Sequence, residues 1–122
     1  GRRFRGLKLW YVLRYFGLSK LRELLRAHIE MARDLESWIA ADDRFELAAP
    51  VPFSTVCFRL SGADSEPRTR ALVAAVNSSG EAFISQTILK GRYSARVAIG
   101  NLATEPADVA ALWRCVQTTA AR

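Results

Sequence analysis

The chain has 122 residues and a net charge of +6 at pH 7; 50% of its residues are apolar and 25% are charged. This length and composition predict one globular domain with a modest core. They exclude a membrane span, because charged residues interrupt each apolar stretch before the roughly 18 to 20 residues that a bilayer requires. Cys57 and Cys115 are too few for a disulfide framework or a zinc site. We expect both thiols to be buried, in a reducing, cytoplasmic setting.

The positive charge is concentrated at one end. Residues 1–26 contain eight basic residues and one acidic residue, a net charge of +7, whereas the rest of the chain carries a net charge of −1. Such an end is compatible with nucleic acid, with an acidic membrane surface, or with an acidic surface elsewhere in a larger protein. We predict no nucleic-acid and no membrane partner. Against nucleic acid, the aromatic residues that stack on bases are not interleaved with this charge.

Two helices are expected first. Residues 7–16 are apolar on nearly every side, and Gly17 is suited to end a helix. A helix that is apolar all round has to be buried, and a free domain of this size offers little protein to bury it. From 18 to 41 apolar residues recur every three or four positions, with Ser19 as the expected N-cap. The sole histidine, His28, lies beside this apolar stripe and is interpreted as a solvated or packed side chain.

An α+β pattern follows this second helix. The expected elements are strands at 44–47 and 55–60, a helix at 68–76 ended by Asn77-Ser78-Ser79-Gly80, strands at 82–89 and 92–99, and a last helix capped by Thr104. The Lys90-Gly91 turn makes the last two strands a hairpin. Short connections between strands predict an antiparallel sheet with helices on one face. The residues alone therefore indicate a small α+β domain preceded by two helices.

Several short motifs, spread over the whole chain, resemble one enzyme family. They are Gly1-Arg2-Arg3-Phe4-Arg5 with Lys8 and Trp10, Asp43-Arg44-Phe45-Glu46, Val56-Cys57-Phe58-Arg59-Leu60, Asn77 with Ser79-Gly80, Tyr93 with Arg96, Ala98-Ile99-Gly100-Asn101, Asp108-Val109 and Trp113. In this order and at these spacings they resemble the C-terminal third of the group II pyridoxal-phosphate (PLP) decarboxylases of aromatic amino acids. The chain is therefore expected to be a carboxyl-terminal piece of such an enzyme.

The resemblance implies a fold and a division into two parts. Residues 1–41 would be a buried helix and a long connecting helix from the large domain, and 42–122 would be the small C-terminal α+β domain of the type I PLP fold. The expected partners of this chain are the N-terminal and large domains of the same enzyme, and the enzyme is expected to be a cytoplasmic homodimer. Its amino-acid substrate is expected to be tyrosine, dopa, tryptophan or phenylalanine, from which it releases CO2 and an amine.

The resemblance also implies where the cofactor is bound. PLP chemistry requires a lysine amine, an acidic partner for the pyridine nitrogen and donors for the phosphate. In similar enzymes the lysine follows a histidine upstream of residue 1, and Lys8, Lys20 and Lys90 lack that context. We therefore expect no catalytic and no cofactor-binding residue in this chain, no metal site, and no activity of the chain alone.

Two residues are candidates for substrate binding. Similar decarboxylases place an arginine near the active site at the position of Arg2, and a forked guanidinium suits a carboxylate. A structural ion pair is the alternative role for Arg2. Gly1 stands where many histidine decarboxylases have serine, and glycine leaves room for a larger ring. Other classes of function stay open: a free-standing α+β interaction module or, less favoured, a basic nucleic-acid-binding domain.

Overall fold

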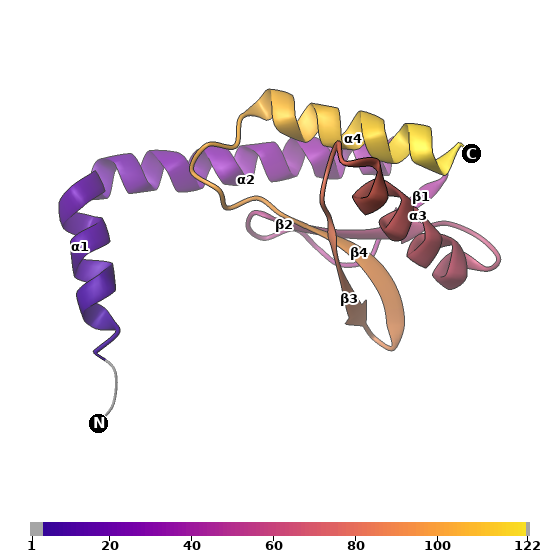
Figure 1. The fold of residues 1–122 in the computed structure, drawn as a ribbon, viewed down its shortest axis with the longest axis horizontal. Helices are drawn as coiled ribbons and strands as arrows, with labels where there is room; N and C mark the ends of the chain where they lie inside the picture. The colour runs from indigo at the N-terminus through magenta and orange to yellow at the C-terminus, as the bar shows by residue number, and fades with distance from the viewer. Residues whose placement is uncertain (1–3, 122) are drawn as a thin grey trace.

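The computed structural model describes residues 4–121 and contains the predicted order of elements (Figure 1). The helices are α1 (Gly6–Phe16), α2 (Leu18–Ala40), α3 (Ser65–Ser79) and α4 (Pro106–Ala120). The strands are β1 (Phe45–Leu47), β2 (Thr55–Leu60), β3 (Ser85–Leu89) and β4 (Arg92–Ala98). Within the described residues, no helix is both long enough and apolar enough to cross a membrane.

The four strands form one antiparallel sheet in the order β1-β2-β4-β3. β3 and β4 are the predicted hairpin, and its turn residues Lys90 and Gly91 both have positive φ, 51° and 75°. Positive φ at both turn positions matches the right-handed twist of the flanking strands. β2 pairs with β4 rather than with β3. These two strands are neighbours in the sheet, although α3 and β3 separate them along the chain.

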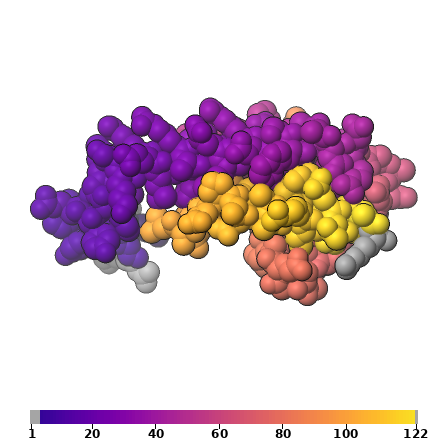
Figure 2. All heavy atoms as spheres, turned by 90° about the horizontal axis from the view of Figure 1, so that it is seen from above, coloured from indigo at the N-terminus to yellow at the C-terminus, as the bar shows by residue number. Residues whose placement is uncertain are grey.

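The core lies on one face of the sheet. Register places Phe45, Val56, Phe58, Ala95 and Val97 on that face, and each of these side chains is buried. α2, α3 and α4 cover it, and Figures 1 and 2 show α2 and α4 side by side along its length. Within residues 4–121, no helix covers the opposite face of the sheet. The predicted fold class, an antiparallel sheet with helices on one face and two helices in front of it, is confirmed.

The first part of the chain extends away from this core. The second half of α2 is buried through residues such as Ala32, Leu35 and Ile39, whereas Leu18 and Leu25 in its first half are more than half exposed. α1 bends away from the start of α2 and has no buried residue (Figure 1). Only the C-terminal part of the apolar stripe of α2 is therefore packed in the core.

Some boundaries differ from those expected. α3 begins at Ser65 rather than at 68, because the Ser65 hydroxyl and the Thr69 hydroxyl bond to the backbone of Leu60 and hold the first turn against the end of β2. β3 begins at 85 rather than at 82. Ser19 does not cap α2, since the cap is Gly17, with φ 78°.

The start of the last helix also differs. Thr104 does not cap α4; Glu105 does, in a reciprocal capping box with Asp108. Pro106 then supplies the fixed φ that suits a first helical position, and it lacks the N–H that would be unpaired there. Cys115 is buried as expected, whereas Cys57 is only half-buried because it lies on the face without helices.

We expect Phe58→Ala to lower the free energy of unfolding by about 3–5 kcal/mol, since it removes a fully buried ring and leaves a cavity. Phe83→Ala is the matched control: its ring is 81% exposed, and its loss should change stability by less than about 0.5 kcal/mol. Urea denaturation of both variants measures the difference. Equal losses would contradict a core confined to one face.

Candidate functional site

The two predicted substrate-binding residues, Gly1 and Arg2, lie outside the described residues. The description begins at Phe4, just ahead of α1. α1 presents exposed aromatic and aliphatic side chains, among them Leu9 at 60% and Trp10 at 53% exposure. Arg14 places its guanidinium 5.8 Å from the centre of the Trp10 ring. α1 is thus a largely apolar helix that the rest of the described chain leaves exposed.

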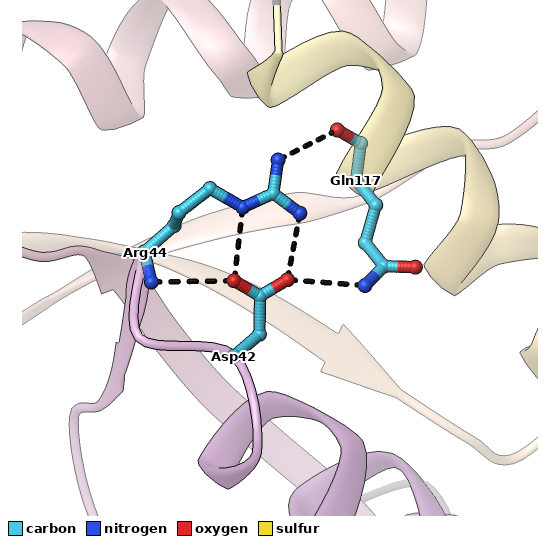
Figure 3. Close-up of polar contacts among 3 residues, drawn as sticks. All are labelled: Asp42, Arg44 and Gln117. Carbon is cyan, nitrogen blue, oxygen red and sulfur yellow. Dashed lines mark hydrogen bonds and ion pairs between the residues drawn. The ribbon is translucent and has the colours of Figure 1, made fainter.

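A polar latch joins the end of α2 to α4 (Figure 3). Asp42 follows α2, and its carboxylate accepts bonds from the Arg44 guanidinium at 2.9 Å (Nε) and 2.7 Å (Nη2). The amide Nε2 of Gln117, on α4, donates to the same carboxylate at 3.0 Å, and the backbone carbonyl of Gln117 accepts from Arg44 Nη1 at 3.3 Å. The three residues therefore tie segments far apart in sequence into one corner of the domain.

This latch has an electrostatic consequence. The forked bonds from Arg44, followed by the bond from Gln117, hold the pKa of Asp42 well below its usual range, and Asp42 in turn raises the pKa of Arg44. The Asp42 side chain is 14% exposed, so its carboxylate is poorly hydrated and depends on these donors. The role of the latch is structural, because both charges are already neutralised by each other.

A second charged cluster lies on the sheet face without helices. Glu46 Oε1 lies 3.1 Å from Arg59 Nε and 3.0 Å from Arg92 Nη2, so one carboxylate serves two guanidinium groups. The Arg59 side chain is only 8% exposed, whereas Glu46 and Arg92 are about half exposed. Because side chains alternate along a strand, the sequence predicts that Arg59 lies on the other face of the sheet from Phe58. The sequence does not reveal that Arg59 is buried there.

Several motif residues build the fold. The Asn77 side chain donates to the Ile84 carbonyl at 2.9 Å and accepts from the Ile84 N–H at 2.8 Å, so it fixes the entry to β3 as a turn residue. His28 is packed, 3% exposed, with Nε2 3.2 Å from the Asn101 carbonyl oxygen. Trp113 packs its ring against Phe45 and Phe58. These side chains hold together the core and the entry to β3.

The described residues contain little that performs chemistry. Lys8, Lys20 and Lys90 are all exposed, the first two on helices and the third in the hairpin turn. Between residues 4 and 121 no group of three or more His, Cys, Asp or Glu side chains is arranged to hold a metal ion. A groove of about 590 Å³ opens beside the latch, lined by Trp38, Asp43 and Arg114 among others. It brings together no nucleophile with a general base.

A family model and the similar proteins point to the same family. The model of the pyridoxal-dependent decarboxylase conserved domain matches residues 1–61. The chain is 43% identical to tyrosine decarboxylase 2 of Arabidopsis thaliana over 99% of its own length and 23% of that protein. It is 45% identical to 4-hydroxyphenylacetaldehyde synthase of Rhodiola rosea, over 98% of this chain and 25% of that protein.

A solved structure shares the fold. The crystal structure of Oryza sativa TDC with PLP and tryptamine superposes with a TM-score of 0.89 and 38% identity, covering 99% of this chain and 27% of that one. The chain thus spans about a quarter of the length of the relatives it matches.

We expect Asp42→Asn to lower the free energy of unfolding at pH 7 by about 1–3 kcal/mol, because it weakens bonds to a charged acceptor. The folded-state pKa of Asp42 is depressed, so its contribution is present above the ordinary value of 3.8 and is lost as the pH falls toward the lower folded value. The gap between variant and parent should therefore narrow below about pH 4. Asp43→Asn, at an exposed neighbour, is the control; an equal loss there would contradict the latch.

Proposed function

Because the chain belongs to the pyridoxal-dependent decarboxylase family, we propose that it is part of a PLP-dependent enzyme that releases CO2 and an amine from an aromatic L-amino acid. The observation that carries this proposal is the match along nearly the whole chain to proteins with aromatic substrates or products in their names, tyrosine decarboxylase 2 and a structure with tryptamine. Tyrosine, dopa, tryptophan and phenylalanine are the substrates to test.

The cofactor would be held elsewhere in the enzyme. PLP supplies the electron sink for loss of the carboxylate, and it requires a lysine amine in a shaped pocket. The described residues do not fit that requirement, since each of the three lysines is exposed on the surface of a helix or a turn. We therefore assign the PLP lysine to the part of the enzyme outside this chain. The chain itself contributes structure and a boundary of the site.

The proposed division of labour follows from burial. We propose that residues 1–41 belong with the large domain and that 42–122 form the small domain. Support comes from α1, which has no buried residue here, and from the exposed apolar side chains at the start of α2. An apolar surface of this kind is unusual on a free protein and fits a covered position in the whole enzyme. The second half of α2 belongs to the core of the small domain, so the helix itself bridges the two parts.

Arg2 and Gly1 are proposed to line the substrate site. They precede the apolar α1 in the sequence, separated from it by residues 3–5, so if the large domain covers that helix, we propose that both residues lie near the boundary between this chain and the active site. A guanidinium at such a boundary is suited to orient a carboxylate or a closing loop. We also propose a cytoplasmic homodimer, for which the free thiols Cys57 and Cys115 and the exposed helix α1 are the support.

A second reaction outcome deserves testing because of one relative. The Rhodiola rosea protein, 45% identical, is named as an aldehyde synthase rather than as a decarboxylase. Loss of CO2 followed by protonation of the same carbon leaves the amine. The aldehyde requires in addition a two-electron oxidation by dioxygen, which is reduced to hydrogen peroxide, and hydrolysis that releases ammonia.

The test is an assay of the full-length enzyme with PLP. We expect tyrosine, dopa, tryptophan or phenylalanine to yield CO2 and the matching amine in equal amounts, as measured by gas release and mass spectrometry. Aldehyde in place of amine would favour the second outcome. As a check on the cofactor assignment, the 122-residue chain mixed with PLP and borohydride should gain no stoichiometric label. A single labelled site at Lys8, Lys20 or Lys90 would contradict it.

For Arg2, we expect Arg2→Lys in the full-length enzyme to lower the turnover number by roughly ten-fold or more, about 1.4 kcal/mol of transition-state stabilisation, because lysine keeps the charge but lacks the forked donors. PLP affinity and melting temperature should stay within error. Arg5→Lys, at an exposed position ahead of α1, is the control. A variant at residue 2 that melts earlier and keeps its turnover number would identify Arg2 as a structural ion-pair partner.

A further inference from the structure

The groove beside the latch has the make-up of a small-molecule site. It lies between the end of α2 and α4, two helices that run side by side (Figure 2). Its volume of about 590 Å³ falls within the roughly 300–1,000 Å³ of ordinary ligand pockets. Trp38 and Ala41 line it from the end of α2, and Ala110 and Trp113 line it from α4. The groove therefore has the mainly apolar and aromatic walls that ligand pockets share.

Two charges of opposite sign remain available in this groove. Asp42 also lines it, but the Asp42 carboxylate is already bonded to Arg44 and Gln117. Asp43 and Arg114, by contrast, are exposed, and in the described part of the chain they form no ion pair with each other or with another residue. A single surface charge is ordinary because water solvates it. An acid and a base that line one aromatic groove without pairing can instead hold a ligand that carries both charges.

The two charges lie on different walls of the groove. Asp43 comes three residues after the end of α2, where the last backbone carbonyls of the helix add a partial negative charge. The carboxylate and the helix end therefore both favour a cationic group on this wall. Arg114 lies on α4, and its forked donors suit a carboxylate. Between them, the half-buried indole ring of Trp38 offers an aromatic surface for a ring.

We propose that this groove binds a free aromatic α-amino acid in its zwitterionic form. Asp43 binds the ammonium group, Arg114 binds the carboxylate, and Trp38 contacts the ring. An aromatic amine would leave Arg114 unused, and an aromatic carboxylic acid would leave Asp43 unused. The groove brings together no nucleophile with a general base, so we assign it binding and no reaction. The ligand follows from the walls of the groove and does not depend on the proposed function.

The test measures binding of radiolabelled L-phenylalanine to the full-length enzyme by equilibrium dialysis. An excess of phenylhydrazine, which reacts with the aldehyde group of PLP, is added first, so that the proposed active site contributes no binding. We expect saturable binding of about one molecule per chain, with a Kd of about 1 mM or below. Absence of saturable binding would overturn the proposal.

Two variants of the full-length enzyme locate the bound molecule. Asp43→Asn and Arg114→Gln each remove one charge from the groove, and we expect each to raise the Kd at least about five-fold. The melting temperature should stay unchanged, because both side chains are exposed. Asp34→Asn and Arg33→Gln, at exposed positions of α2 outside the groove, are the matched controls and should keep the Kd within about two-fold. An unchanged Kd in either groove variant, or an equal rise in its control, would contradict the assignment.

Analogues test which charge each residue binds. Phenethylamine lacks the carboxylate and 3-phenylpropionate lacks the ammonium group, so each should bind at least about five-fold more weakly than L-phenylalanine. Arg114→Gln should weaken phenethylamine no further, and Asp43→Asn should weaken 3-phenylpropionate no further. Phenethylamine that binds as tightly as L-phenylalanine would rule out a zwitterion site.

The two proposals fail separately. The product assay tests the function, and binding to the blocked enzyme tests the groove. An active enzyme without saturable binding would refute the groove site alone. A full-length protein without decarboxylase activity that still binds L-phenylalanine, and loses it in the two groove variants, would refute the function and support the site.

Discussion

The contact of the Trp113 ring with Phe45 and Phe58 is the interaction on which this domain depends. The ring centres lie 4.9 Å and 6.2 Å apart, and the two phenylalanines meet each other at 5.8 Å. They join α4 to two strands, and the Asp42–Arg44 pair closes the same corner from outside. Because this cluster lies on one face of the sheet, α2, α3 and α4 pack against that face. The other face is left to polar side chains by the same geometry.

Because the core lies on one face of the sheet, the residues that build the fold are separate from the residues that we propose for substrate binding. The motifs that resemble the decarboxylases supply Phe45, Phe58, Asn77 and Trp113, which serve as core and turn residues here. These four residues are part of the family resemblance and of the packing of this domain at the same time. The substrate-binding residues that we propose, Gly1 and Arg2, lie before α1 in the sequence and do not belong to this core.

Local patterns predicted this fold well where the neighbours are local. Alternation from 55 to 60 fixed β2, and the hairpin turn at Lys90-Gly91 followed from its residue types. The start of α3 was missed because Ser65 is held by a bond to the Leu60 carbonyl, a tertiary contact that propensity does not encode. Burial of Arg59 was equally unpredictable. It depends on β2 lying between β1 and β4, and β4 arrives only after an intervening helix and strand. The candidate site at Gly1 and Arg2 rests on resemblance alone.

The exposed apolar side of α1 and the charged cluster of Glu46, Arg59 and Arg92 differ in what they can contribute to assembly. The apolar side chains of α1 would contribute binding free energy in proportion to the apolar area that is buried, but this contribution does not fix the orientation of the partner. A guanidinium in a fixed position on a flat sheet contributes little net affinity, since desolvation of the charge offsets much of its attraction. It does fix orientation, because a forked donor meets a carboxylate in one plane. If the small domain helps to shape a substrate site at its edge, the orientation of that domain matters more than the strength with which it is bound.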